Sequence, residues 1–167
     1  MSKATFLLPT AADTAALGAA LGDALRPGDV IALNGPLGAG KTTLARAAIQ
    51  RRCGFADAPS PTFTLVETYP GDGLTIWHFD FYRLENAEDA WELGIEDAFS
   101  DGASLIEWPS RAPSVIPAHA LSITLSASDG RRRADIAAPP DWRERLEKIA
   151  DQLKNQTTNT LSSTVST

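Results

Sequence analysis

The sequence has little of what marks disulfide-bonded or membrane-spanning proteins. Its 167 residues include one cysteine, Cys53, which excludes an intrachain disulfide and fits a reducing cytoplasm. No apolar run approaches the ~18 residues needed to cross a bilayer. The N-terminus also lacks the long apolar stretch of a signal peptide. We therefore expect a cytoplasmic protein with no membrane partner.

Positive charge is also scarce. The formal net charge is −6, and the one basic run is Arg131-Arg132-Arg133. A protein that holds nucleic acid by itself usually presents a basic face. Direct, tight binding of RNA or DNA is therefore not favoured, and we interpret the arginine run either as a solvated turn or as a grip on phosphate.

Hydrophobic residues make up 43% of the chain, enough for one globular domain with its own core. We expect that domain to span residues 1–154. From Asn155 onward the sequence is almost entirely Thr, Ser, Asn and Gln, with little apolar content and no charge. Such a composition predicts a disordered polar tail over residues 155–167.

Strand and helix patterns alternate along the chain, which predicts an α/β fold. An all-apolar strand over 30–33 is typical of the centre of a sheet covered on both faces. Asp13 is a candidate helix cap, and Asp141 opens a final helix with Glu144 in capping-box spacing. The predicted strands are 5–8, 30–33, 62–69, 74–81, 103–107, 121–125 and 132–137, and further helices are expected over 41–52 and 87–93.

A glycine-rich loop follows the strand 30–33 and opens a helix. It matches G-x-x-x-x-G-K-[ST], whose glycines let backbone N–H groups point inward at phosphate oxygens. Lys41 brings positive charge to the phosphates, and the Thr42 hydroxyl is placed to ligate Mg²⁺. A glycine turn in an ordinary strand–helix unit is the alternative. The residues predicted to bind ATP or ADP are Gly35, Leu37, Gly38, Ala39, Gly40, Lys41, Thr42 and Thr43.

Two acidic residues near strand ends are candidate partners of the loop. Glu107 ends an apolar strand in the manner of a degenerate Walker B motif, so we expect it to contact Mg²⁺ together with Thr42; a surface ion pair is the alternative. Asp80 could position water or contact Mg²⁺ through water. Strand alternation places His78 on the same face as Asp80. His78 either orients Asp80 or is a core histidine with satisfied hydrogen bonds.

The sequence leaves the roles of two further features open, a proline-containing segment and a tryptophan. Ser60-Pro61-Thr62 lies where switch proteins place a segment that senses the γ-phosphate, although the prolines could simply punctuate a loop. Trp108 either stacks on a nucleotide base, contacts another protein or packs in the hydrophobic core. Alternation puts Trp108 opposite Glu107, so a direct role for both requires the strand to end at Glu107.

Four motifs together resemble those of the bacterial TsaE (YjeE) ATPases. They are Gly35-Pro36-Leu37-Gly38-Ala39-Gly40-Lys41-Thr42-Thr43, Ser60-Pro61-Thr62-Phe63-Thr64-Leu65-Val66, His78-Phe79-Asp80-Phe81-Tyr82-Arg83-Leu84 and Glu107-Trp108-Pro109. The resemblance covers about residues 5–150. It implies a P-loop NTPase-type three-layer sandwich with a mixed, partly parallel central sheet.

The resemblance also implies an activity. Such proteins bind ATP or ADP with Mg²⁺, hydrolyse ATP slowly alone, and act with TsaB and TsaD in making N6-threonylcarbamoyladenosine at position 37 of tRNA. It further implies that the tRNA is met only indirectly, through the complex.

The resemblance assigns roles residue by residue. Lys41, Asp80 and Glu107 are the implied catalytic residues, with Thr42 and Glu107 as the Mg²⁺ contacts. Trp108 and the turn near Arg131 are implied to contact the nucleotide. One departure is Pro36, which stands where the family usually has an acidic residue and which lacks a backbone N–H.

Other functions remain as competing hypotheses. A GTPase would need an Asn-Lys-x-Asp sequence, which does not occur. A small-molecule kinase would need an acceptor pocket and usually an arginine-rich lid, for which this short chain barely has room. A nucleotide-dependent scaffold, in which hydrolysis is incidental, is the third alternative.

Overall fold

A single mixed β-sheet forms the middle of the molecule. The computed structural model describes residues 1–54, 61 and 64–164 (for 156–164, the backbone only). In these residues seven strands form one sheet in the order β1-β7-β6-β2-β5-β4-β3. The strands are β1 (Ser2–Leu8), β2 (Val30–Asn34), β3 (Val66–Gly71), β4 (Leu74–Asp80), β5 (Ala103–Glu107), β6 (Leu121–Ser128) and β7 (Arg131–Ala138).

The parallel part of the sheet surrounds β2. β2 pairs in parallel with β5 on one side and with β6 on the other, and β4 pairs in parallel with β5. The remaining neighbours, β1–β7, β6–β7 and β3–β4, are antiparallel. Val30 to Leu33 are buried, as expected for a strand that is covered on both faces. The predicted mixed, partly parallel sheet is confirmed.

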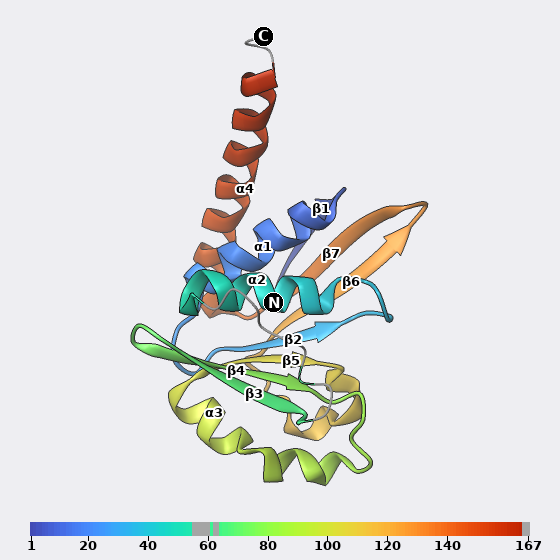
Figure 1. Cartoon of the computed structure of the whole chain (residues 1–167), viewed down its shortest axis with the longest axis vertical. Helices are drawn as coiled ribbons and strands as arrows, with labels where there is room; N and C mark the ends of the chain where they lie inside the picture. Colours follow the sequence, from blue (N-terminus) through green and yellow to red (C-terminus); the bar gives the residue numbers. More distant parts are fainter. Residues whose placement is uncertain (55–60, 62–63, 165–167) are drawn as a thin grey trace.

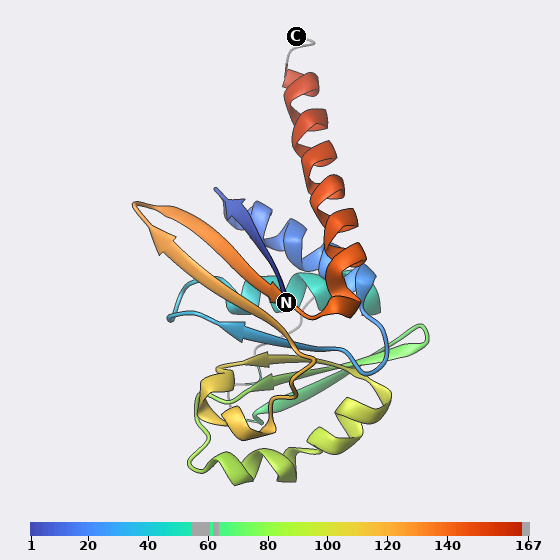
Figure 2. The same ribbon diagram turned by 180° about the vertical axis from the view of Figure 1, so that it is seen from behind.

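Helices cover both faces of the sheet, which completes the predicted three layers (Figures 1 and 2). α1, α2 and α4 pack on one face through Leu17, Leu44 and Ile149, and α3 lies on the other face with Phe79 and Ile106. The helices are α1 (Ala11–Ala24), α2 (Lys41–Cys53), α3 (Ile95–Asp101) and α4 (Arg143–Thr164), with 3₁₀ turns η1 (Ala87–Leu93), η2 (Pro109–Arg111), η3 (Pro113–Val115) and η4 (Pro140–Trp142).

The first helix starts earlier than Asp13, the cap that we predicted. Thr10 is the N-cap, and Asp13 is the third helical residue of a capping box. The Asp13 carboxylate accepts the Thr10 backbone N–H at 2.8 Å, and the Thr10 hydroxyl accepts the Asp13 N–H at 3.3 Å. The reciprocal Thr10–Asp13 pair satisfies two backbone N–H donors, whereas an Asp cap alone would satisfy one. This explains why the helix begins at Thr10 and not at Asp13.

Two predicted elements differ in extent. The strand expected over 62–69 begins at Val66, and residues 62 and 63 lie outside the described residues. The helix expected over 87–93 is a 3₁₀ segment. After Gly94, which has φ +83°, the chain forms α3, a helix that was not predicted from the sequence. A run of seven residues is too short for helical periodicity to stand out.

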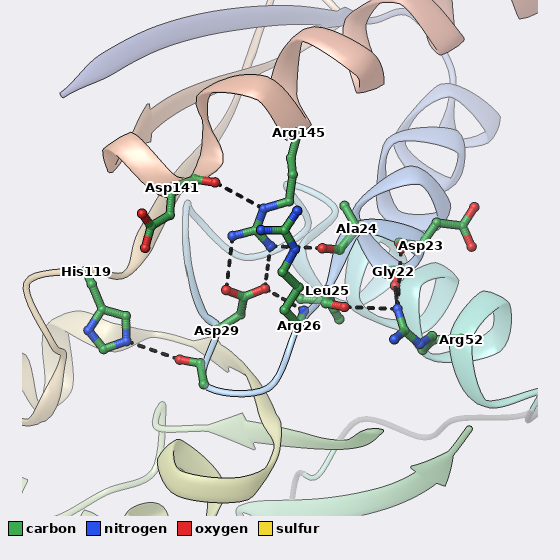
Figure 3. Close-up of polar contacts among 11 residues, drawn as sticks. Gly22, Asp23, Ala24, Leu25, Arg26, Asp29, Arg52, His119, Asp141 and Arg145 are labelled. Atoms are coloured by element: carbon green, nitrogen blue, oxygen red, sulfur yellow. Dashed lines mark hydrogen bonds and ion pairs between the residues drawn. The ribbon is translucent and has the colours of Figure 1, made fainter. Parts of the chain in front are cut away.

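An ion pair anchors α4 to the loop before β2 (Figure 3). Arg145 donates to both Asp29 oxygens, at 2.6 and 3.2 Å, and also to the Ala24 carbonyl at 2.9 Å. The guanidinium lies 3.6 Å from the centre of the Trp142 ring. The sequence spaces the apolar residues Trp142, Leu146, Ile149 and Leu153 as one helical stripe, and in the structure the first three are buried while Leu153 is half-buried against the core.

The C-terminal half of α4 extends away from the rest of the molecule (Figures 1 and 2). We expected a disordered tail from Asn155, but the helix continues to Thr164. Residues 155–164 contain no Gly or Pro, so nothing in them stops a helix already started by the packed first turns. Among the described residues, no helix is both long enough and apolar enough to traverse a membrane.

Candidate functional site

The glycine loop connects β2 to α2 with its glycines in conformations that side chains disfavour. Gly40, the N-cap of α2, has φ +106°, and Gly35 has φ +143°. A Cβ atom on Gly35 would lie 2.5 Å from the Leu125 carbonyl oxygen, so the loop packs against β6 at that point. The loop therefore begins on a position that only glycine fits, and ends at a helix N-terminus that attracts anions.

Lys41 fills the centre of the loop. Its side chain is buried, and the ammonium donates to the backbone carbonyls of Gly35 and, at 2.9 Å, of Pro36. It also lies 4.2 Å from the centre of the Trp108 ring. Burial lowers the pKa of Lys41, while the charges of Glu107 and Asp80 oppose that shift. The ammonium is thus held by neutral groups at the point where the loop would receive an anion.

Glu107, at the end of β5, is the most constrained carboxylate of the site. It is 3% exposed, and each of its oxygens has a partner. Oε1 accepts the Thr42 hydroxyl at 2.9 Å, and Oε2 lies 2.7 Å from Nε2 of His78. The alternative of a surface ion pair is wrong, because the carboxylate is buried. β2 and β5 run parallel with Leu33 opposite Glu107, which brings the acid to the strand end where the loop begins.

Asp80 lies beside Glu107 at the end of β4, to which it is paired across the parallel ladder. The Tyr82 backbone N–H donates to Oδ1 of Asp80 at 3.0 Å. Burial is the main cause that raises the pKa of Asp80, and the nearby Glu107 adds to the increase. The Tyr82 hydrogen bond and the charges of His78 and Lys41 act in the opposite direction.

These residues line one cavity of about 410 Å³. Nine of the predicted site residues meet there: Leu37, Gly38, Gly40, Lys41, Thr42, Thr43, Asp80, Glu107 and Trp108. Gly35 and Ala39 do not line it. Gly35 packs closely against β6, and Ala39 is buried in the core. Four further residues line the cavity: Leu65, Tyr82 and Arg83, for which no role was predicted, and Arg132, which belongs to the arginine run considered above as a possible phosphate contact.

Trp108 meets the condition that a direct role requires. β5 ends at Glu107, and Trp108 turns into the left-handed region with φ +58°, so strand alternation no longer applies to it. Its ring then faces the cavity, above the Lys41 ammonium and 4.9 Å from the Tyr82 ring. Non-glycine residues rarely adopt this backbone conformation, and such residues are frequent at functional sites.

The arginine run divides between two hollows. Arg131 does not reach the loop cavity; it lines a neighbouring hollow with Ser126 and Ser128. Arg132 lines both hollows. Alternation along β7 explains the difference and could have predicted it, since Arg132 shares its face with the buried Ala134 and that face packs on α1 and α2.

The predicted switch segment is described only in part. Ser60 and Thr62 lie outside the described residues, and Pro61 is buried. The Leu65 N–H donates to the Pro61 carbonyl at 3.0 Å, and the Asp80 N–H donates to the Leu65 carbonyl at 3.0 Å. Leu65 has φ +62°. The end of this segment is therefore tied by backbone hydrogen bonds to a residue of the cavity.

The fold and the loop define a class: a P-loop NTPase-type α/β protein. The cavity lies at the carboxyl ends of the parallel strands β2, β5 and β4, where sheets of this kind bind ligands.

Comparison with known proteins defines the family. The model of the family "Threonylcarbamoyl adenosine biosynthesis protein TsaE" matches residues 8–134. The chain belongs to the TsaE family, which takes part in threonylcarbamoyladenosine biosynthesis on tRNA.

Relatives that carry the family's name occur in several bacteria. The TsaE protein of Rickettsia conorii is 38% identical over 122 residues, which cover 72% of this chain and 70% of that protein. That of Bacillus subtilis is 33% identical over 137 residues, or 77% of this chain and 79% of its own length. The crystal structure of Bacillus subtilis YdiB superimposes with a TM-score of 0.72 at 26% identity and covers 93% of this chain and 97% of that one.

Proposed function

We propose that this chain binds ATP or ADP with Mg²⁺ and hydrolyses ATP slowly, as a subunit of the assembly that makes threonylcarbamoyladenosine on tRNA. The observation that carries the proposal is the hydroxyl–carboxylate pair of Thr42 and Glu107, 2.9 Å apart, next to the buried Lys41 ammonium. Lys41 and Thr42 lie in the first turn of α2 and Glu107 ends β5, and all three groups line one cavity.

The phosphates have a receptor in the loop itself. The loop glycines and the N-terminus of α2 offer backbone N–H groups and a partial positive charge. Lys41 adds a full charge. In the structure its hydrogen bonds go to loop carbonyls, which an incoming phosphate oxygen, a charged acceptor, would replace with stronger bonds.

The residues present fit Mg²⁺ that arrives with a nucleotide. Mg²⁺ prefers oxygen ligands and is usually held through one or two protein groups, with substrate phosphates and water completing the shell. Thr42 and Glu107 supply a hydroxyl and a carboxylate side by side. When bound, the ion would neutralise charge on the phosphate oxygens.

Hydrolysis needs an oriented water, and we propose that Asp80 orients it. One of its oxygens is fixed by the Tyr82 N–H, and the side chain lines the cavity beside Glu107. Positioning supplies most of the catalysis in phosphoryl transfer. We therefore propose that the activity of the isolated chain is low and that partner proteins raise it.

The partners proposed are TsaB and TsaD, with the tRNA held by the complex and not by this chain directly. Membership in the family supports the pathway. The net charge of −6 supports an indirect contact with tRNA. We also propose that the protein acts in the cytoplasm, and its membership in this tRNA-modification family supports that location.

Lys41→Ala tests the proposal, with Lys148→Ala as the control because Lys148 is an exposed lysine on α4. The loss of a charged contact of about 1.5–3 kcal/mol predicts roughly 10- to 150-fold weaker binding of a fluorescent ADP in the Lys41 variant. ATP hydrolysis and tRNA modification with purified TsaB and TsaD should fall with it, while Lys148→Ala should match the wild type.

Two outcomes would contradict the proposal. Full tRNA modification by Lys41→Ala would leave nucleotide turnover without a function and would favour the scaffold. Release of ADP only when a small acceptor is consumed would identify a kinase instead.

A further inference from the structure

His78 is buried in the sheet, yet its one hydrogen bond in the described part of the chain goes to the site. It lies on β4 with no exposed side-chain surface, and its Nε2 atom is 2.7 Å from Oε2 of Glu107. Its Nδ1 atom is buried and has no hydrogen-bond partner among the described residues. The register places His78 opposite Leu105, two residues before Glu107 on the same face of the sheet.

This arrangement differs from both alternatives that the sequence left open. A histidine kept only to fill the core is expected to satisfy its polar atoms, and His78 leaves Nδ1 unsatisfied. A histidine that orients Asp80 would be bonded to Asp80, but the bond is to Glu107. Because an ionised carboxylate only accepts hydrogen bonds, Nε2 is the donor. The imidazole therefore presents one N–H to one oxygen of Glu107.

The two oxygens of Glu107 consequently have separate tasks. A carboxylate turns easily about its last torsion angle, which is broad and roughly two-fold. The His78 bond holds Oε2 on the interior side, so Oε1 faces the Thr42 hydroxyl. With both side chains almost fully buried, water does not compete for that bond.

We propose that His78 is the positioning residue of Glu107 and thereby sets the affinity of the site for Mg²⁺. This inference rests on the proposed function of nucleotide binding at the same cavity. Hydrogen-bond partners of metal-ligating carboxylates typically change metal affinity by about 10- to 100-fold when they are removed. Nucleotide binding without Mg²⁺ depends on the loop and Lys41, so it should not change.

Two amide substitutions separate the donor from the shape of the side chain. In His78→Gln the amide nitrogen is as many bonds from the backbone as Nε2, so a donor toward Glu107 is kept. In His78→Asn the amide nitrogen sits at the position of Nδ1, away from Oε2. Both variants place a neutral amide at a buried position, which makes them a matched pair.

The experiment measures binding of a fluorescent ADP, first in EDTA and then as MgCl₂ is added, and uses Mn²⁺ binding by electron paramagnetic resonance as a direct readout of the metal. We expect equal affinities in EDTA for the wild type and both variants. The Mg²⁺ concentration at half-effect should rise about 10- to 100-fold in His78→Asn. In His78→Gln it should stay near the wild-type value. Melting temperatures report whether each variant is folded.

Each outcome bears on the proposal. A wild-type Mg²⁺ response in His78→Asn overturns it, and so does an equal loss in both variants when their affinity in EDTA is intact. If His78→Asn does not fold, His78→Gln decides: a normal Mg²⁺ response supports the donor role, and a weakened one overturns it. Failure of the wild type to bind ADP under any condition would instead refute the proposed function.

Discussion

The ion pair between Arg145 and Asp29 should be among the most costly polar interactions to break in this protein. Their side chains are 7% and 12% exposed, and two hydrogen bonds of 2.6 and 3.2 Å join them. Asp29 also accepts the Arg26 backbone N–H at 2.7 Å (Figure 3). The substitution Asp29→Asn keeps the shape and removes the charge. It leaves the Arg145 guanidinium buried without its counter-charge.

The expected loss of folding free energy in Asp29→Asn follows from the burial of both side chains. Removing one partner of a buried pair costs about 3–5 kcal/mol, because the remaining charge stays desolvated. The control is Asp23→Asn, whose pair with Arg51 is 42% and 58% exposed on the two sides. An exposed pair contributes about 0–1 kcal/mol. At about 2–4 °C per kcal/mol for a domain of this size, we expect Asp29→Asn to melt about 6–20 °C lower and Asp23→Asn at most about 4 °C lower.

Urea unfolding followed by circular dichroism measures the two free energies, and a double-mutant cycle with Arg145→Met isolates the interaction between Asp29 and Arg145. Asp29 precedes the start of β2, whereas the glycine loop follows its end. ADP affinity at a temperature where the variant is folded should therefore not change. The reasoning is refuted if Asp29→Asn destabilises the protein no more than Asp23→Asn does.

Two further predictions concern single side chains. Burial raises the pKa of the Cys53 thiol, so at a given pH less reactive thiolate is present than in the unfolded chain. The rate at which Cys53 reacts with Ellman's reagent should be lower in the folded protein than in urea. The rate of the folded protein should still increase with pH at values where the rate of the unfolded chain no longer changes. Superimposable pH profiles of the two rates would contradict this prediction. Arg132→Ala should weaken ADP binding about tenfold or more, because Arg132 lines the loop cavity. Arg131→Ala is the control, and equal losses in both variants would show that the hairpin acts only through its overall charge.

Local sequence was enough to predict most of the elements. The apolar run of Val30–Leu33 and the glycine loop after it define a strand, a turn and a helix without reference to the rest of the chain, and the structure has all three. The alternation of His78 and Asp80 with Phe79 and Phe81 also predicts which side chains share a face of the sheet, and in the structure Phe79 and Phe81 pack together on the side of α3.

The predictions of the cap of α1 and of the C-terminal tail were wrong for reasons that local sequence does not reveal. Thr10 and Asp13 are both good helix caps, and only their reciprocal hydrogen bonds decide between them. Asn155 and the residues after it have a composition typical of disorder, but they follow a helix that is already held in place by Arg145 and Trp142. Composition does not reveal such an anchor.

Sequence alone therefore determined the kinds of groups in the candidate site: a glycine loop with Lys41 and Thr42, and an acid at the end of a strand. It could not determine which groups touch. Thr42 and Glu107 lie 65 residues apart in the chain, and the parallel pairing of β2 with β5 brings them within 2.9 Å. The register of β4 against β5 directs His78 to Glu107 and not to Asp80. Periodicity fixes the face of a sheet on which a side chain lies, but its partner on that face depends on strand order and register, which only tertiary packing decides.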